Sequence, residues 1–223
     1  MTERSTRGTS SAGRPVRPAL TRDYIIRTAM ALIDRDGVSA LSMRKLGAEL
    51  GVDPMAVYYY LPNKSALFDG LIEAVYTEIE TAFDAVSEGS WREQVATFMR
   101  AMREVLRRHP NLLSVIATRP AYAPSVLAFG DRAIGLVQSS GFTGREILHM
   151  VNCLRTFTVG HVFAEMGDPV GGPTTSPEAV NAMILESYPN LAEAISGGYQ
   201  PDEEYELGLQ ALLDGFEQRL SRS

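Results

Sequence analysis

The chain between residues 42 and 67 is divided into helical segments too short to stand alone, and this stretch most constrains the fold. Gly51 is placed to end one segment in a left-handed conformation, and Pro54 suits the first helical position of the next. Pro62 disfavours helix in the residue before it, so the second segment must end near Tyr60. Two short helices joined at Gly51, with a longer one before them, have the layout of a helix-turn-helix.

Helical patterns continue on both sides of this stretch. Thr21 can cap a first helix that ends at Gly37, and Asn63 can cap a helix whose apolar residues recur at i, i+3 and i+4 through Ile79. No strand alternation stands out, so we predict an all-α fold. Further helices are expected at residues 90–108, 110–118, 122–140, 143–166, 177–196 and 202–221.

The composition fits a globular protein of the reducing cytoplasm. Hydrophobic residues make up 45% of the 223 residues, enough for a real core, and the single cysteine, Cys153, excludes an intrachain disulfide framework. Residues 1–19 carry four arginines with Gly, Pro, Ser and Thr, so we expect a disordered basic arm and no signal peptide. No apolar run approaches the length of a membrane span. We therefore expect a cytoplasmic location and no membrane partner.

The charge is divided unevenly along the chain. Residues 1–70 hold ten Lys or Arg and seven Asp or Glu, a net charge of +3, whereas residues 71–223 hold eleven and twenty, a net charge of −9. The overall charge of −6 therefore hides a basic N-terminal third, which favours a polyanionic partner at that end.

The second short segment has two faces of different chemistry. If Val57 and Tyr60, three residues apart, face the core, then Met55, Tyr58 and Tyr59 project from the other side, with Pro54 at the tip. Met and Pro can pack against thymine methyl groups in a major groove, and a tyrosine hydroxyl can bind a phosphate. The alternative is that all three tyrosines pack between helices.

Two cations stand in the first turns of helices, where the helix dipole disfavours them. They are Arg44 and Lys64. A phosphate bound there would explain both, because free backbone N–H groups and the cation would hold one anion together. The alternative for each is a solvated surface cation.

These residues resemble the DNA-binding domain of TetR-type (tetracycline repressor) regulators over about residues 20–67. The resemblance is carried by Leu41-Ser42-Met43-Arg44-Lys45-Leu46, Gly51-Val52, Val57-Tyr58-Tyr59-Tyr60-Leu61 and Asn63-Lys64-Ser65-Ala66-Leu67. It implies base contacts from Met43 and Arg44 and from Pro54, Met55 and Tyr59. It implies phosphate contacts from Tyr58 and Lys64. Tyr60 and Leu61 depart from the common His and Phe.

The C-terminal part is similar, more loosely, to the regulatory domain of the tetracycline repressors. The similarity rests on Trp91-Arg92-Glu93, Thr118-Arg119-Pro120, Phe157-Thr158-Val159-Gly160 with Glu165, and the segments 206–209 and 212–215. It implies a ligand cavity within the helices and a homodimer built from the helices at 143–166 and 202–221. The domains would then be residues 1–19 (arm), 20–67 (helix-turn-helix) and 68–223 (effector binding and dimerisation).

The effector is expected to be a small apolar or amphipathic molecule. Candidate pocket residues are Met99, Met102, Phe157 and His161, although a Met stripe at helical spacing also suits plain core. No His stands near Val115, where the tetracycline-binding members supply one to drug-bound magnesium, so magnesium-tetracycline is not expected. His161 and Glu165 give two metal ligands without a third, so no metal or other cofactor is predicted.

The sequence thus predicts a ligand-responsive, dimeric transcription regulator, a repressor that binds double-stranded DNA at a palindromic operator. The alternative is a helical enzyme acting on small molecules, with His161 and Glu165 or His109 as acid-base groups. The arginines of the arm, Arg14 and Arg17, either contact the minor groove or belong to a flexible tail.

Overall fold

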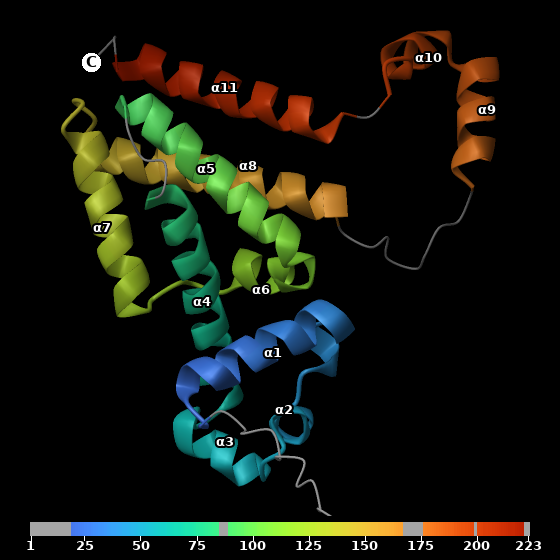
Figure 1. Cartoon of the computed structure of the whole chain (residues 1–223). Coiled ribbons are helices and arrows are strands. Elements are labelled where there is room, and N and C mark those ends of the chain that lie inside the picture. The colour runs from blue at the N-terminus through green and yellow to red at the C-terminus, as the bar shows by residue number, and fades with distance from the viewer. Residues whose placement is uncertain (1–18, 85–88, 167–175, 199, 221–223) are drawn as a thin grey trace, which may run out of the picture.

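The computed structural model describes residues 19–84, 89–166, 176–198 and 200–220, and these segments hold eleven α-helices, two 3₁₀ turns and no strand. The all-α prediction is confirmed. Figure 1 shows the three N-terminal helices at one end of the molecule and the remaining helices stacked above them. The helices are α1 (Arg22–Asp36), α2 (Met43–Leu50), α3 (Pro54–Tyr60), α4 (Lys64–Asp84), α5 (Trp91–Arg108), α6 (Leu113–Thr118), α7 (Pro124–Gln138), α8 (Gly144–Met166), α9 (Pro177–Ser187), α10 (Pro189–Ile195) and α11 (Pro201–Leu220).

The helix starts follow the capping residues of the sequence. The Thr21 side chain accepts from the Tyr24 amide, and the Ser42 side chain accepts from the Lys45 amide. Asn63 accepts from the Ala66 amide at 2.9 Å, which fixes the start of α4. Each of these contacts satisfies a backbone N–H that the helix itself leaves without a partner.

The predicted helix at residues 177–196 is wrong, because the structure has two helices there. Tyr188 takes a non-helical conformation, φ −133° and ψ 74°, and Pro189 begins α10. Proline lacks the N–H that a continuing helix needs and disfavours helix in the residue before it. The predicted helix at 110–118 likewise begins with a 3₁₀ turn, Pro110–Leu112.

Helix α4 joins the two ends of the molecule. It runs for 21 residues and packs against α1 near its start and against α5 and α7 farther along. At Gly70 a Cβ would lie 2.4 Å from Cδ1 of Ile26, so a larger residue there would force the Ile26 side chain to move. The boundary predicted at residue 67 falls inside this continuous helix.

The C-terminal helices form a bundle in which α5, α8 and α11 pack on one another, with α7 beside α4 and α8. Helices α9 and α10 pack on each other and lie to the side of the bundle in Figure 1. Among the described helices, none combines the length and the hydropathy that crossing a lipid bilayer requires.

Candidate nucleic-acid interface and effector site

The turn between α2 and α3 is fixed by two glycines and an aspartate. Gly51 adopts the left-handed conformation, φ 69° and ψ 34°, and ends α2. A Cβ on Gly47 would lie 3.0 Å from the Val52 carbonyl oxygen and 3.2 Å from the Pro54 nitrogen, so a side chain there would push α3 away. Asp53 accepts from the Met55 amide at 2.8 Å and caps α3. The angle between the two helices is therefore set by the backbone.

One residue of helix α3 is buried, and the other residues are partly or fully exposed. Val57 is fully buried, whereas Met55 is 71% exposed and Tyr59 is 85% exposed. Tyr58 and Tyr60 are exposed to almost the same extent, 39% and 37%. The prediction that Tyr60 is a core residue is therefore wrong.

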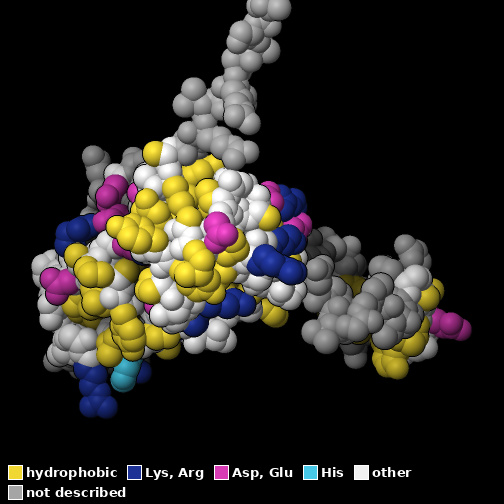
Figure 2. Space-filling model, turned by 90° about the horizontal axis from the view of Figure 1, so that it is seen from below, with side chains coloured by type: hydrophobic (Ala, Val, Ile, Leu, Met, Phe, Trp, Pro, Cys, Tyr) yellow, Lys and Arg dark blue, Asp and Glu magenta, His cyan; other side chains and the backbone are white. Residues whose placement is uncertain are grey.

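The physical reason lies in the turn after α3. Leu61, just beyond the helix, is 1% exposed and takes the core position on that side. Tyr60 instead packs the edge of its ring against Tyr59, with centroids 5.2 Å apart. Figure 2 views this end of the molecule: apolar side chains occupy the middle of the face, and Lys and Arg side chains lie around them.

Helix α2 presents one of its two predicted contact residues. Arg44 is exposed, but Met43 is only 8% exposed and belongs to the hydrophobic core. A buried side chain has little surface to offer a partner. Met43 therefore holds α2 against the core. Of these two residues in the first turn of α2, Arg44 is the one exposed to a partner.

Lys64 is held beside the start of α2. Its ammonium donates to the Leu41 carbonyl at 3.3 Å and lies 5.6 Å from the centre of the Phe68 ring. Leu41 directly precedes Ser42, the cap of α2. One cation at the start of α4 therefore lies next to the N-terminus of a second helix, and both helix ends favour an anion.

An ion cluster of four residues fixes α1 against α2. Arg35 binds Glu49 at 2.8 Å and Asp36 at 3.0 Å, and Lys45 binds the other oxygen of Asp36 at 2.8 Å. Hydrogen bonds from Arg35 and Lys45 lower the pKa of Asp36 to about 2, and Arg35 also lowers the pKa of Glu49. These contacts tie α2 to the C-terminal end of α1.

In the C-terminal bundle the structure brings three of the four predicted effector residues together around Tyr205. Its hydroxyl donates to the Met99 carbonyl at 2.9 Å and is 2.9 Å from the Thr158 hydroxyl. Its ring stacks on Phe157 at 5.3 Å and meets the edge of His161 at 5.2 Å. Burial raises the pKa of Tyr205 to about 12. Met102 is also buried.

His161 is buried without a hydrogen bond. Its side chain is 7% exposed, and neither ring nitrogen has a hydrogen-bond partner among the described residues. Its neighbour Glu165 lies 3.7 Å away but is bound more closely by Arg103 at 2.9 Å and Arg107 at 3.2 Å. Within the described residues no group of three or more His, Cys, Asp or Glu is placed to hold a metal.

Two family models match the chain. One, described as "Bacterial regulatory proteins, tetR family", matches residues 25–71, and the other, "Tetracyclin repressor-like, C-terminal domain", matches residues 85–220. The second match alone spans more than half of the chain. The chain belongs to the TetR family.

Relatives in the TetR family match over nearly the full length. The "HTH-type transcriptional repressor DrrR1" of Streptomyces coeruleorubidus is 29% identical, over 92% of this chain and 80% of that protein. The class A tetracycline repressor of Escherichia coli is 30% identical, over 90% of this chain and 92% of that protein. The crystal structure of Streptomyces coelicolor ActR in complex with actinorhodin is 26% identical, with a TM-score of 0.74, over 91% of this chain and 99% of that one.

TetR-family membership makes the chain a DNA-binding transcription regulator and not an enzyme. Two of the three residues of the enzymatic alternative, His109 and Glu165, have structural partners. His109 lies between Asp34 at 2.9 Å and Glu78 at 3.4 Å and links α5 to α1 and α4. Glu165 is held by two arginines, as described above.

In this TetR-family chain the sequence prediction missed an aromatic cluster between α4, α5 and α7. The rings of Phe83, Phe98 and Phe129 lie 5.2 to 6.0 Å apart, and Arg132 lies over Phe129 while pairing with Glu80. The only sign of this cluster in the local sequence was Phe98, which directly precedes Met99 and lies near Met102. Phe83 and Phe129 are far from it in sequence, so their meeting depends on the packing of three helices.

Proposed function

We propose that this chain is a ligand-responsive repressor that binds a palindromic operator as a homodimer and is released by a small-molecule effector. The observation that carries the proposal is the exposed outer face of α3, where Met55 and Tyr59 project from a helix whose orientation the backbone fixes. Large apolar side chains held outward near the exposed cations Arg44 and Lys64 suit a DNA groove better than water.

The DNA contacts divide by the chemistry of each side chain. Pro54, Met55 and Tyr59 face the base edges, where apolar atoms can pack against thymine methyl groups. Tyr58 and Lys64 bind phosphates, and Arg44 reaches the same groove from α2. Met43 supports this surface from the core.

Each part of this function is assigned to its own domain. Residues 20–67 bind DNA, and residues 68–223 bind the effector and form the dimer. Residues 1–19 form the basic arm; Arg14 and Arg17, its candidate minor-groove residues, lie outside the described residues.

The homodimer is supported by an exposed stripe along α8 and α11. Leu148 and Phe163 of α8 and Leu207 of α11 are exposed hydrophobic residues. Cβ atoms added to Gly160 in α8 and Gly215 in α11 would have no neighbour within 4 Å, so nothing in the protomer requires glycine there. A second copy packing closely on these helices would explain both the apolar side chains and the glycines. Such a two-fold interface suits a palindromic operator whose half-sites lie about 34–36 Å apart.

The effector site is supported by the two clusters on either side of α5. Phe157 and His161, with Met99 and Met102 behind them, combine apolar surface with two ring nitrogens that have no hydrogen-bond partner in the described part of the chain. Phe83, Phe98 and Phe129 provide a second apolar wall suited to a flat ring system. ActR, a relative, has been crystallised with actinorhodin. We therefore assign an apolar or amphipathic effector with hydrogen-bonding groups.

A gel-shift titration with fragments of genomic DNA tests the regulator. The protein should retain specific fragments, and Lys64→Ala should weaken retention about threefold to tenfold, because one charge-assisted phosphate contact is lost. Arg108→Ala is the matched control, because it removes one positive charge at the end of α5. Absence of any retained fragment, or equal retention by the Lys64 variant, would refute the proposal.

A further inference from the structure

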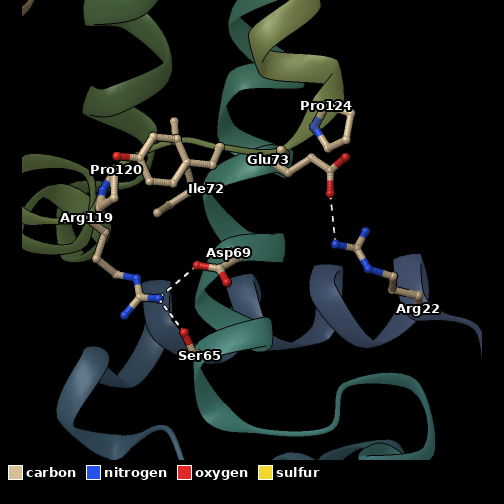
Figure 3. Close-up of a pocket in the computed structure, with 11 residues that line it drawn as sticks. Arg22, Ser65, Asp69, Ile72, Glu73, Arg119, Pro120 and Pro124 are labelled. Atoms are coloured by element: carbon tan, nitrogen blue, oxygen red, sulfur yellow. Dashed lines mark hydrogen bonds and ion pairs between the residues drawn. The ribbon is translucent and has the colours of Figure 1, made fainter.

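The strongest unassigned feature is a cavity of about 440 Å³ where the DNA-binding helices meet the C-terminal bundle. One wall is formed by α1 and the first half of α4, and the other by the segment 119–124 between α6 and α7 (Figure 3). Its volume lies within the range of about 300–1,000 Å³ typical of small-molecule sites. It is separate from the two clusters proposed above for the effector.

The cavity is lined by apolar side chains together with charged ones. Ile72, Pro120, Ala121 and Pro124 line it together with the exposed ring of Tyr122. Such a surface can bury a ring or a short hydrocarbon body, since most small-molecule sites are lined by apolar side chains with a few polar groups.

Each side of the cavity carries an arginine paired with a carboxylate of α4. Arg22 of α1 binds Glu73 at 2.8 Å, and Arg119 binds Asp69 at 2.8 Å and the Ser65 hydroxyl at 2.9 Å (Figure 3). The two pairs balance in charge, so the cavity has no net charge that would reject an anion. Asp69 is 59% exposed, so its carboxylate can turn into water at little cost.

Arg119 has a buried donor without an acceptor in the described part of the chain. Its Nε is buried and has no hydrogen-bond partner among the described residues. A buried N–H without an acceptor costs free energy, and an arginine holds a carboxylate best through two parallel N–H bonds. An incoming carboxylate could therefore accept from the terminal nitrogen of Arg119 that now binds Asp69.

We propose that this junction cavity is a second ligand site, for a small organic acid with an aromatic or alicyclic body. The carboxylate binds Arg119, and the ring lies against Ile72 and the proline-rich segment 120–124. Because the ligand would bridge the DNA-binding helices and the bundle, its binding is coupled to operator affinity by the same factor in both directions. That last consequence, unlike the binding itself, rests on the proposed function.

Isothermal titration of the full chain with 1-naphthoate, without DNA, tests the site. We expect a dissociation constant of about 1 mM or lower for this small ligand. Arg119→Gln should weaken binding about tenfold by removing a charged hydrogen-bond donor, and the neutral analogue 1-naphthamide should bind about tenfold more weakly to the unchanged chain. Asp69→Asn should tighten naphthoate binding, because it removes the competing carboxylate but leaves Arg119 in place.

Arg132→Gln is the matched control, because Arg132 is also a carboxylate-paired arginine but lies at the Phe83–Phe98–Phe129 cluster. It should leave binding unchanged. A loss of binding in Arg132→Gln but not in Arg119→Gln would place the probe in the aromatic cluster and overturn the proposal. No binding at about 1 mM, equal binding of the amide, or no tightening in Asp69→Asn would also overturn it. Because no DNA is present, these results are independent of whether the chain represses transcription.

Discussion

Replacing Tyr205 by phenylalanine removes one hydroxyl from the centre of the α5–α8–α11 packing and leaves the ring in place. Tyr205 is 2% exposed, and its hydroxyl serves both the Met99 carbonyl and the Thr158 hydroxyl. The variant leaves these two buried groups without that partner. A buried polar group that loses its hydrogen bond costs about 1–3 kcal/mol, so Tyr205→Phe should lower the free energy of unfolding by about this amount near pH 8.

The same hydroxyl predicts how this difference changes with pH. Burial raises the pKa of Tyr205 from 10 to about 12 in the folded chain, so the folded state keeps a proton that the unfolded state loses above pH 10. The stabilisation is fully present below pH 10 and is lost as pH rises towards 12. Two pKa units correspond to about 2.7 kcal/mol, so the advantage of the unchanged chain should shrink or reverse over this window.

Urea unfolding followed by circular dichroism at pH 8, 10 and 11 measures the effect. Protein concentration is held constant, because the apparent stability of the proposed homodimer would depend on it. Tyr188→Phe is the control, since Tyr188 is exposed, and it should change stability by less than about 0.5 kcal/mol. A Tyr205→Phe variant as stable as the unchanged chain at pH 8 would refute the role of the hydroxyl. A difference that does not change between pH 8 and 11 would refute the account of its ionisation.

Three further results are expected. Lys64→Ala should reduce the slope of log affinity against log salt concentration by about 1, measured by gel shift at several salt concentrations, and an unchanged slope would remove Lys64 from the phosphate contacts. Gly160→Trp should shift the sedimentation of the protein from dimer to monomer. Gly135→Trp is the control, because Gly135 is another exposed helical glycine with open space around it, and it should leave the dimer intact. A dimer in both variants would exclude α8 from the interface. The pKa of Asp36 is lowered to about 2, chiefly by its hydrogen bonds to Arg35 and Lys45, so this carboxylate stabilises the fold above its ordinary pKa of 3.8, and the contribution is lost as pH falls towards 2. Asp36→Asn should therefore weaken the acid dependence of unfolding between pH 4 and 2, and an unchanged acid profile would show that the pair contributes nothing.

The helix boundaries near the DNA-binding end could be predicted because their causes are local. Gly51, Asp53 and Asn63 act on backbone groups within four residues of themselves, so the local sequence contains both partners of each contact. The break at Pro189 had the same kind of local signal, and the prediction of one helix there overlooked it.

The orientation of side chains was harder to predict. Helix α3 is seven residues long, and one buried residue, Val57, fixes its rotation only coarsely. A small rotation exchanges the exposures of Tyr58 and Tyr60, so helical spacing alone could not separate them. The burial of Met43 depends similarly on how α2 lies against the core.

The contacts that join distant parts of the chain could not be predicted. The Arg35–Glu49 pair spans 14 residues and the Arg103–Asp202 contact spans 99. No periodicity in one helix identifies its partner in another, because these pairs form only after the helices pack. The same holds for the cavity at Arg119, whose walls come from three separate segments.

The tight turn at Gly47 has a consequence for how the binding specificity of this protein could evolve or be redesigned. Any side chain at Gly47 would meet the backbone of Val52 and Pro54, so the angle of α3 is not open to gradual change. Met55 and Tyr59, by contrast, contribute little to the folded core, and exposed substitutions of this kind usually change stability by less than about 0.5 kcal/mol. Under the function proposed above, new operator sequences can therefore be acquired by exchanging these outward side chains on an unchanged framework, without compensating mutations elsewhere.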